Sequence, residues 1–239
     1  MLALDLSSSM LAEDFAPANR LDVARRTAID FVRARASDRI GLVAFAGQAL
    51  TQVPITTDYP VLEQAIRLLR IGILEDGTAI GTGLATAANR LRRAPGRSKV
   101  IILLTDGVNN AGTVDPRTAA QAAAAFGIRI YTIGVGTIGE APVPTGQGPM
   151  GLRYETMPVK IDEALLDDIA RPTGGRYFRA SDAASLSSIF AEINRLEKAP
   201  VQHLVYRRYE EAYRWPLGLG LLALALELVV SATFAVRVP

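Results

Sequence analysis

The chain of 239 residues contains no cysteine and only one histidine, His203. Without cysteine it can form neither disulfides nor thiolate metal sites, and both a cytosolic and a periplasmic setting stay open. Hydrolysis by an activated serine needs a base beside the nucleophile, and the one imidazole lies just before a long apolar segment. Neither GxSxG nor the phosphate-binding pattern GxxxxGKS/T occurs. These absences argue against catalysis.

Lysine is also scarce, with Lys99, Lys160 and Lys198 as its only occurrences. Arginine therefore carries nearly all of the positive charge, and its positions are scattered along the predicted helices rather than gathered on one face. Lysine and arginine together number 26 against 24 acidic residues, a formal net charge of +2. Because so small an excess gives no electrostatic footprint for DNA or RNA, we expect no nucleic-acid partner.

One long apolar segment stands near the end of the sequence, WPLGLGLLALALELVVSATFAV at residues 215–236. As a helix, these 22 residues would cover roughly 33 Å, against a bilayer hydrocarbon core of ~30 Å. Trp215 at its start and Arg237 after its end suit the two membrane interfaces. The alternative is a buried helix of a soluble domain, but such helices are seldom apolar on every face. We therefore predict a transmembrane helix in contact with lipid.

Glu227 is the single charged residue of this segment. A carboxylate is costly at bilayer depth, so Glu227 either pairs with another helix as a functional residue or is tolerated without a role. The preceding residues, 198–214, are predicted to form a juxtamembrane stalk. Its arginines Arg207, Arg208 and Arg214 would either meet lipid phosphates or be offset by neighbouring glutamates in a plain stalk helix.

Residues 1–197 are predicted to form one soluble domain, a length that buries a sizeable core. The opening MLALDLSSSM has no signal-peptide pattern. Its apolar run Leu2–Leu4 ends at once in polar residues, as the last residues of a buried strand do. We therefore expect a truncated first strand, whose beginning would lie upstream together with any further membrane segments.

Strand and helix patterns alternate along this domain. Continuous apolar runs such as KVIILL indicate strands covered on both faces. The predicted strands are 2–4, 39–45, 49–53 as an antiparallel edge, 99–104, 129–135 and 176–179, and the predicted helices are 21–35, 59–69, 80–93, 117–126, 162–171 and 183–196. The alternation predicts an α/β fold, a Rossmann-like doubly wound and mostly parallel sheet flanked by helices. Residues 138–160, rich in proline and glycine, are predicted to be a surface excursion in the form of a hairpin.

Three polar clusters lie where predicted strands end or helices begin. They are DLSSS at 5–9, DGT at 76–78 and TDG at 105–107. Because function in such sheets gathers at the carboxyl ends of the strands, these clusters are expected to meet. Their carboxylates and hydroxyls, without imidazole or thiol, suit a hard cation such as Mg²⁺. Taken singly, each cluster could equally be a helix cap or a turn.

The clusters together resemble the metal-ion-dependent adhesion site of von Willebrand factor type A (VWA) domains, and the resemblance covers roughly residues 1–197. The matching residues are Asp5, Ser7, Ser9, Thr78, Asp106 and Gly107. The resemblance implies that the three hydroxyls bind the cation, that the two aspartates act directly or through water, and that the glycine leaves room beside it. The cation would be Mg²⁺, or alternatively Mn²⁺ or Ca²⁺. It would capture an Asp or Glu carboxylate of a protein partner at an open coordination position, without catalysis.

Longer stretches resemble one group of VWA proteins, the bacterial aerotolerance-type (Bat, BatA/BatB-like) membrane proteins. These stretches are LALDLSSSMLAEDF at 2–15, LTQVPIT at 50–56, DGTAIG at 76–81, TGGRY at 173–177 and RLEK at 195–198. The resemblance implies anchoring in the bacterial inner membrane and a role in the envelope or in stress. It also implies a MoxR-type AAA+ ATPase and other VWA or Bat proteins as partners. Such proteins usually carry membrane segments ahead of the domain, which this sequence does not show.

Several alternatives stay open on the sequence. Glu13 and Asp14 would rim the cation and, with Gly107, contact a partner, or they are solvated loop residues. The domain could be a structural scaffold with a vestigial metal site. A phosphohydrolase of the haloacid-dehalogenase kind also places an aspartate after its first strand. That enzyme needs a second carboxylate two residues further on, where this chain has Ser7.

The predicted membrane topology depends on which pattern is followed. Arg207, Arg208 and Arg214 before the apolar helix outnumber Arg237 after it, which by the positive-inside rule would leave the domain in the cytoplasm. The resemblance to Bat proteins instead implies a periplasmic domain with a single C-terminal span. We follow the resemblance, because membrane segments further upstream would dominate the orientation.

Overall fold

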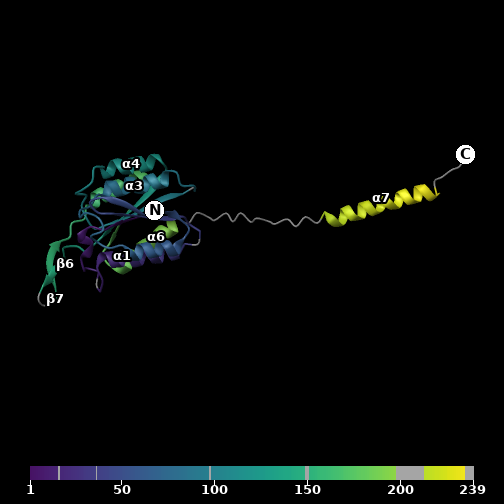
Figure 1. Cartoon of the computed structure of the whole chain (residues 1–239). Coiled ribbons are helices and arrows are strands. Elements are labelled where there is room, and N and C mark those ends of the chain that lie inside the picture. The colour runs from purple at the N-terminus through teal and green to yellow at the C-terminus, as the bar shows by residue number, and fades with distance from the viewer. Residues whose placement is uncertain (16, 36, 97, 149–150, 198–212, 235–239) are drawn as a thin grey trace. The chain divides into compact units, whose positions relative to one another are not determined.

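The computed structural model describes residues 1–15, 17–35, 37–96, 98–148, 151–197 and 213–234. Its chain separates into two compact units, Met1–Ala199 and Pro200–Pro239 (Figure 1). The first unit is an α/β domain, and the described part of the second is one helix. His203, Arg207, Arg208 and Arg237, which the sequence analysis considered, lie outside the described residues.

A six-stranded sheet in the order β3-β2-β1-β4-β5-β8 forms the centre of the domain. Its strands are β1 (Leu2–Asp5), β2 (Ile40–Phe45), β3 (Ala49–Thr56), β4 (Lys99–Thr105), β5 (Ile128–Val135) and β8 (Tyr177–Ala180). All neighbours are parallel except the edge strand β3, which runs antiparallel to β2. The prediction of a mostly parallel sheet with an antiparallel edge is confirmed. The order reverses direction between β1 and β4, where such sheets place their sites.

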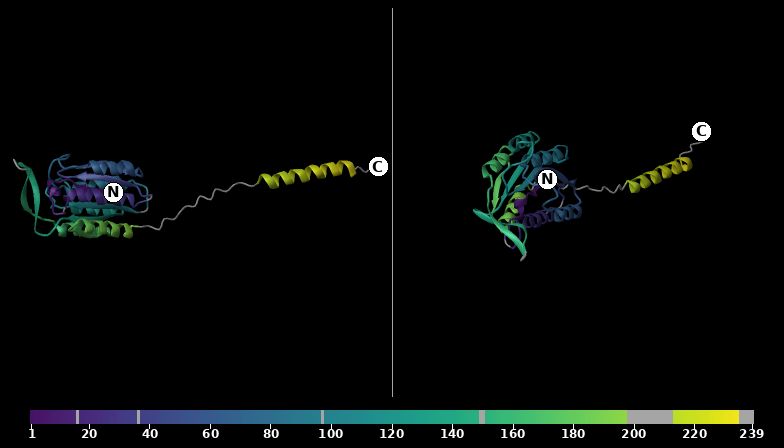
Figure 2. Two further views of the ribbon diagram at one scale, coloured as in Figure 1. Left: turned by 90° about the horizontal axis from the view of Figure 1, so that it is seen from below. Right: turned by 60° about the vertical axis from the view of Figure 1, so that its left-hand side comes forward.

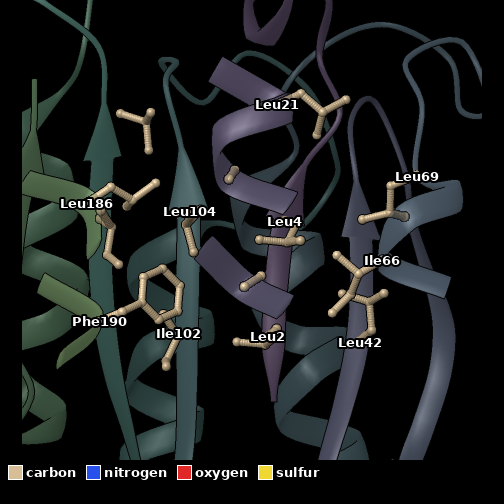
Figure 3. Close-up of a cluster of buried hydrophobic side chains, with 14 of the residues drawn as sticks. Leu2, Leu4, Leu21, Leu42, Ile66, Leu69, Ile102, Leu104, Leu186 and Phe190 are labelled. Atoms are coloured by element: carbon tan, nitrogen blue, oxygen red, sulfur yellow. The ribbon is translucent and has the colours of Figure 1, made fainter. Parts of the chain in front are cut away.

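Helices cover both faces of this sheet. Figures 1 and 2 show α1 (Arg20–Arg33), α2 (Tyr59–Leu68) and α6 (Ala183–Leu196) on one side, and α3 (Ile80–Arg92), α4 (Pro116–Ala125) and α5 (Glu163–Ala170) on the other. Alternate residues of β1 and β4 belong to the two cores. Leu4 and Leu104 lie in one core (Figure 3), and Ala3 and Leu103 lie in the other. Burying each leucine contributes roughly 1.5–3 kcal/mol. Because both faces of β1 and β4 are covered, residues 2–4 and 100–104 are apolar at every position.

Aspartate and asparagine side chains set where most of these helices begin. The Asp115 carboxylate accepts from the backbone N–H of Thr118 at 2.8 Å, with Pro116 as the first helical residue. An aspartate cap followed by proline in the first turn is a common start of a helix. Asn19 caps α1 in the same way, and Asp182 caps α6 in a reciprocal arrangement with Ser185. Each such cap contributes about 1 kcal/mol.

Residues 140–158 form a separate two-stranded antiparallel hairpin, β6 (Glu140–Gly148) and β7 (Gly151–Pro158). Figure 2 shows it projecting from one end of the domain. Its base is attached to the loop after β1, because the Glu13 backbone N–H donates to the Pro142 carbonyl at 2.9 Å. Ala141 and Val143 also pack on Ala12 in a small apolar cluster. The predicted excursion thus lies beside the first polar cluster.

The helix α7 (Arg214–Phe234) is the described part of the second unit. Its residues Trp215–Thr233 have a mean hydropathy of 1.8, and none of them is buried. By length and composition this is one helix able to cross a membrane. Trp215 and Glu227 both lie on it.

Candidate metal centre

The first and third polar clusters meet because β1 and β4 are neighbours in the sheet. Leu4 pairs with Leu104, so Asp5 at the end of β1 and Asp106 after the end of β4 lie at the same edge. Both side chains are buried, with residue exposures of 0% and 2%. We call this edge, where the parallel strands end, the carboxyl edge.

Hydrogen bonds fix the Asp5 carboxylate from two sides. One oxygen accepts from the backbone N–H of Ser7 at 2.9 Å, and the other from the Thr105 hydroxyl at 2.6 Å. The Ser7 and Ser9 hydroxyl oxygens lie 3.0 Å apart. The Ser9 hydroxyl in turn donates to Asp106 Oδ1 at 2.7 Å. Two hydroxyls and two carboxylates therefore converge where the strands β1 and β4 end.

The second cluster joins them through the loops at the carboxyl edge. The Asp76 carboxylate accepts from the Ser8 backbone N–H at 2.8 Å and from the Ser8 hydroxyl at 2.7 Å. The Thr78 backbone N–H donates to Asn110 Oδ1 at 2.8 Å, and the Thr78 carbonyl accepts from the Asn110 backbone N–H at 3.1 Å. Thr78 is buried, with 3% of its surface exposed. Three loops far apart in the sequence are thus held in one arrangement.

Gly107 lies against Thr78. A Cβ added at Gly107 would stand 3.2 Å from Thr78 Oγ1, closer than most side-chain contacts. The backbone at Gly107 is not in the left-handed region, so the glycine is required for space rather than for conformation. It keeps room beside the Thr78 hydroxyl.

The two aspartates disfavour each other's ionisation. Burial and then the charge of Asp106 raise the pKa of Asp5 to about 7. Burial likewise raises the pKa of Asp106, although the neighbouring Arg20 guanidinium opposes the shift. Because Asp5 and Asp106 titrate as a coupled pair, the raised pKa is a property of the pair rather than of one residue. The edge therefore holds more negative charge than the surrounding groups neutralise.

Arg20 supplies the positive charge nearest to the pair, and the sequence analysis did not single it out. Its Nη1 lies 2.7 Å from Asp106 Oδ2, and its Nε and Nη2 donate to Asp14 at 2.8 and 2.5 Å. Only 3% of the residue is exposed. An arginine at the first position of a helix opposes the helix dipole. This unfavourable placement of a positive charge is the one signal in the sequence that could have pointed to Arg20.

The position of Asp14 corrects the sequence analysis. Its side chain is 4% exposed and accepts from Arg20 and from both the N–H and the hydroxyl of Thr137 at 3.0 Å. Asp14 is therefore neither a solvated loop residue nor a free carboxylate on the rim. Burial and then the Arg20 hydrogen bonds act in opposite directions on its pKa, which is lowered overall. Glu13 is exposed and accepts from the Tyr154 hydroxyl at 3.2 Å.

The donor set at this edge fits a small hard cation. It consists of carboxylate and hydroxyl oxygens around two buried, mutually repelling aspartates, of which only Asp106 has an ion-pair partner in the described chain. Among the described residues, no group of three or more His, Cys, Asp or Glu side chains could hold a metal ion. A cation here would therefore depend on Ser7, Ser9 and Thr78 for further ligands.

One family model matches the domain that carries this edge. The model of the von Willebrand factor type A domain matches residues 1–192, and the chain belongs to this family. It is 30% identical to a UPF0353 protein of Mycolicibacterium gilvum over 94% of the chain and 67% of that protein. The chain thus spans about two thirds of the length of that relative.

Solved structures show the same fold. An aerotolerance-related membrane protein from Bacteroides fragilis is 32% identical, with a TM-score of 0.70, over 82% of this chain and 96% of that one. Proximal thread matrix protein 1 of the mussel byssus, solved with a zinc-occupied MIDAS motif, is 21% identical, with a TM-score of 0.58. That match covers 80% of this chain and 46% of the mussel protein, and it shows likeness of fold alone.

Proposed function

We propose that this chain is a membrane-anchored, cation-dependent protein-binding domain. The carboxyl edge holds a divalent cation, Mg²⁺ or alternatively Mn²⁺ or Ca²⁺, through Ser7, Ser9 and Thr78, with Asp5 and Asp106 in support. When bound, the cation supplies the positive charge that attracts an Asp or Glu carboxylate of a protein partner. The helix at residues 215–236 holds the domain at the membrane.

The observation that carries this proposal is the unbalanced pair of buried carboxylates. Burial raises the pKa of both Asp5 and Asp106, the charge of Asp106 adds to the shift of Asp5, and Arg20 is the one guanidinium that contacts the pair in the described structure. Burial of like charges is costly unless a cation or a proton compensates it. A divalent cation would do so at neutral pH and would draw on the Ser7 and Ser9 hydroxyls, which already lie 3.0 Å apart.

The chain's own residues prepare the site for a partner. The bonds from Ser8 to Asp76 and from Thr78 to Asn110 fix the three loops before any ligand arrives, which lowers the ordering cost of binding. Gly107 leaves space at Thr78. The exposed Glu13 and the hairpin β6–β7 stand beside this edge, so they would form the rim that a partner contacts.

The cellular setting is part of the proposal. Likeness to an aerotolerance-related membrane protein supports a place in a bacterial membrane complex, with other VWA or Bat proteins and a MoxR-type AAA+ ATPase as partners. We propose the inner membrane, with the domain in the periplasm and the C-terminus in the cytoplasm. Activity of a periplasm-specific reporter fused to the C-terminus would contradict that orientation.

A second candidate function is a structural scaffold with a vestigial metal site. The ion pair between Arg20 and Asp106 favours it, since an internal guanidinium already takes part of the role that a cation would have. An Asp-dependent phosphohydrolase has no such support. Its second carboxylate would stand at position 7, where the Ser7 hydroxyl is 3.0 Å from that of Ser9. We therefore propose a non-catalytic function.

The test is the cation dependence of partner binding. Partners captured by the wild-type chain from solubilised membranes and lost with Asp5→Ala are identified first. The affinity of such a partner should fall with EDTA, return with Mg²⁺, and be lost in a folded Thr78→Ala variant. A folded Thr78→Ala chain that keeps full affinity for the partner would show that the interface lies elsewhere, as the scaffold function requires.

A further inference from the structure

A concentration of arginine lies at the end of the domain opposite the carboxyl edge. The ten residues Arg90–Lys99, RLRRAPGRSK, contain five basic side chains and no acidic one. They run from the last turn of α3 to the start of β4, and Arg39 stands just before β2. The arginines were predicted to be scattered, but the fold gathers these ones, because α3 ends where the parallel strands β2 and β4 begin.

Three of these side chains surround a shallow pocket. Arg39, Arg90 and Arg93 are exposed, and with apolar neighbours such as Ile55 and Pro95 they line a volume of about 220 Å³. In the part of the chain that the structure describes, none of the three is ion-paired with an acidic side chain. Three guanidinium groups around an apolar floor suit a phosphate that carries an apolar remainder.

The acidic side chains at this end already have partners. Asp38 is ion-paired with Arg35 at 2.8 Å, and Glu197 is ion-paired with Arg129. Asp58 accepts from a backbone N–H at the start of α2. None of these three carboxylates is ion-paired with Arg39, Arg90 or Arg93 in the described part of the chain.

An exposed aromatic ring accompanies the arginines. The Arg92 guanidinium lies over the Phe126 ring, 5.5 Å from its centre, and Phe126 is 45% exposed. A cation beside an exposed ring is a combination that favours the boundary between lipid headgroups and acyl chains. The surface around Arg92 and Phe126 is thus both positively charged and apolar.

The chain leaves the domain at this same end. Glu197, directly after α6, accepts from the Ser98 hydroxyl at 3.0 Å and from the Tyr131 hydroxyl at 2.6 Å, which fixes it beside the start of β4. Residues 198–214 separate it from Trp215. At ~3.3–3.6 Å per residue, these 17 residues span at most about 60 Å. This length limits how far the end of α6 can move from any membrane that α7 enters.

We propose that this amino-edge surface, formed by Arg39, Arg90, Arg92, Arg93 and Phe126, docks the domain onto anionic phospholipid headgroups. The inference rests on the membrane anchor of the proposed function and is independent of the cation. Docking would turn the carboxyl edge away from the bilayer and leave it open to a partner. Because charge attraction at a surface decays within ~8 Å at physiological ionic strength, docking should be sensitive to salt.

The absence of cysteine allows a single fluorescent label on the full chain. Ser37→Cys places a donor beside Arg39, and Thr113→Cys places one in the exposed loop between β4 and α4 at the opposite end. The chain is inserted into nanodiscs of phosphatidylcholine, with or without phosphatidylglycerol, that contain an acceptor lipid. Energy transfer from position 37 should rise with phosphatidylglycerol and fall back in high salt, while transfer from position 113 should not rise.

Matched variants test whether docking depends on this surface or only on the net positive charge of the chain. Arg39→Gln/Arg90→Gln/Arg93→Gln should abolish the rise caused by phosphatidylglycerol. Arg67→Gln/Arg70→Gln/Arg117→Gln, which removes the same charge at the end of α2 and the start of α4, toward the carboxyl edge, should keep it. Equal transfer in both lipids, or an equal loss in both triple variants, would overturn the proposed docking while leaving the anchor intact. A chain that does not co-purify with the nanodisc would refute the anchor and this inference with it.

Discussion

Arg20 Nη1 lies 2.7 Å from Asp106 Oδ2, and the same guanidinium holds Asp14 with its other nitrogens. Asp14 also accepts from Thr137, which leads from β5 into the hairpin β6–β7. One buried arginine therefore links the carboxyl edge to the hairpin that stands beside it. The first prediction concerns this link.

Replacing Arg20 by methionine should destabilise the domain by about 3–5 kcal/mol, because two buried carboxylates lose their partner. Urea unfolding measures the loss. The control is Arg117→Met, which breaks the half-exposed pair with Asp168 and should cost only about 0–1 kcal/mol. Equal costs for the two variants would show that the Arg20 pair is no more than a surface ion pair.

The second prediction is a pH dependence in EDTA. The pKa of Asp5 is raised to about 7 in the folded domain from an ordinary value of 3.8, so the folded state holds its proton more tightly than the unfolded state does. Stability should therefore fall as pH rises through this interval. Carboxylates with a lowered pKa, such as Asp14, act in the opposite sense, but mainly below about pH 5. The melting temperature should fall between about pH 5 and 7 in the wild type, and less so in Asp5→Asn. Identical slopes in both proteins would contradict this assignment.

The third prediction concerns the room beside Thr78. In Gly107→Ala the new methyl group would press on Thr78 Oγ1 at 3.2 Å, so divalent-cation affinity should fall about tenfold, about 1.4 kcal/mol. Calorimetry measures the affinity. The double variant Gly107→Ala/Thr78→Ser keeps the hydroxyl and removes the neighbouring methyl group, so it should recover part of the loss. Unchanged affinity in Gly107→Ala would show that this space is not used.

The fourth prediction concerns the anchor. Removing Pro200–Pro239 should release a folded, monodisperse domain into the soluble fraction, because none of the residues described in that unit belongs to the two cores of the domain. The full chain should resist extraction by carbonate. Aggregation or unfolding of the shortened chain would mean that the apolar helix belongs to the globular core.

The order of strands and helices was predictable because each element carries its own periodicity. KVIILL is apolar throughout since both of its faces are covered, and Asp115-Pro116 marks a helix start through a local hydrogen bond. Ser7 and Ser9 lie together for a similarly local reason, because residues two apart in a turn are neighbours in space. The sequence signal for each of these features lies within a few neighbouring residues.

Contacts between distant residues were not predictable in this way. Nothing near Arg20 in the sequence shows that it pairs with Asp106, 86 residues away, and Asp14 looked exposed because its partner was unknown. The bond from Thr78 to Asn110 likewise exists only once two loops meet. Arginines that seemed scattered between positions 39 and 93 share one end of the sheet for the same reason.

Titration of the purified protein with Mg²⁺ by calorimetry tests the central claim most directly. The wild type should bind one divalent cation, and the variant Ser7→Ala/Ser9→Ala, with an unchanged circular dichroism spectrum, should not. The bound cation should also raise the free energy of unfolding by RT ln(1 + [L]/Kd), and the melting temperature with it. Equal binding by the wild type and the folded double variant would contradict a cation site at the carboxyl edge.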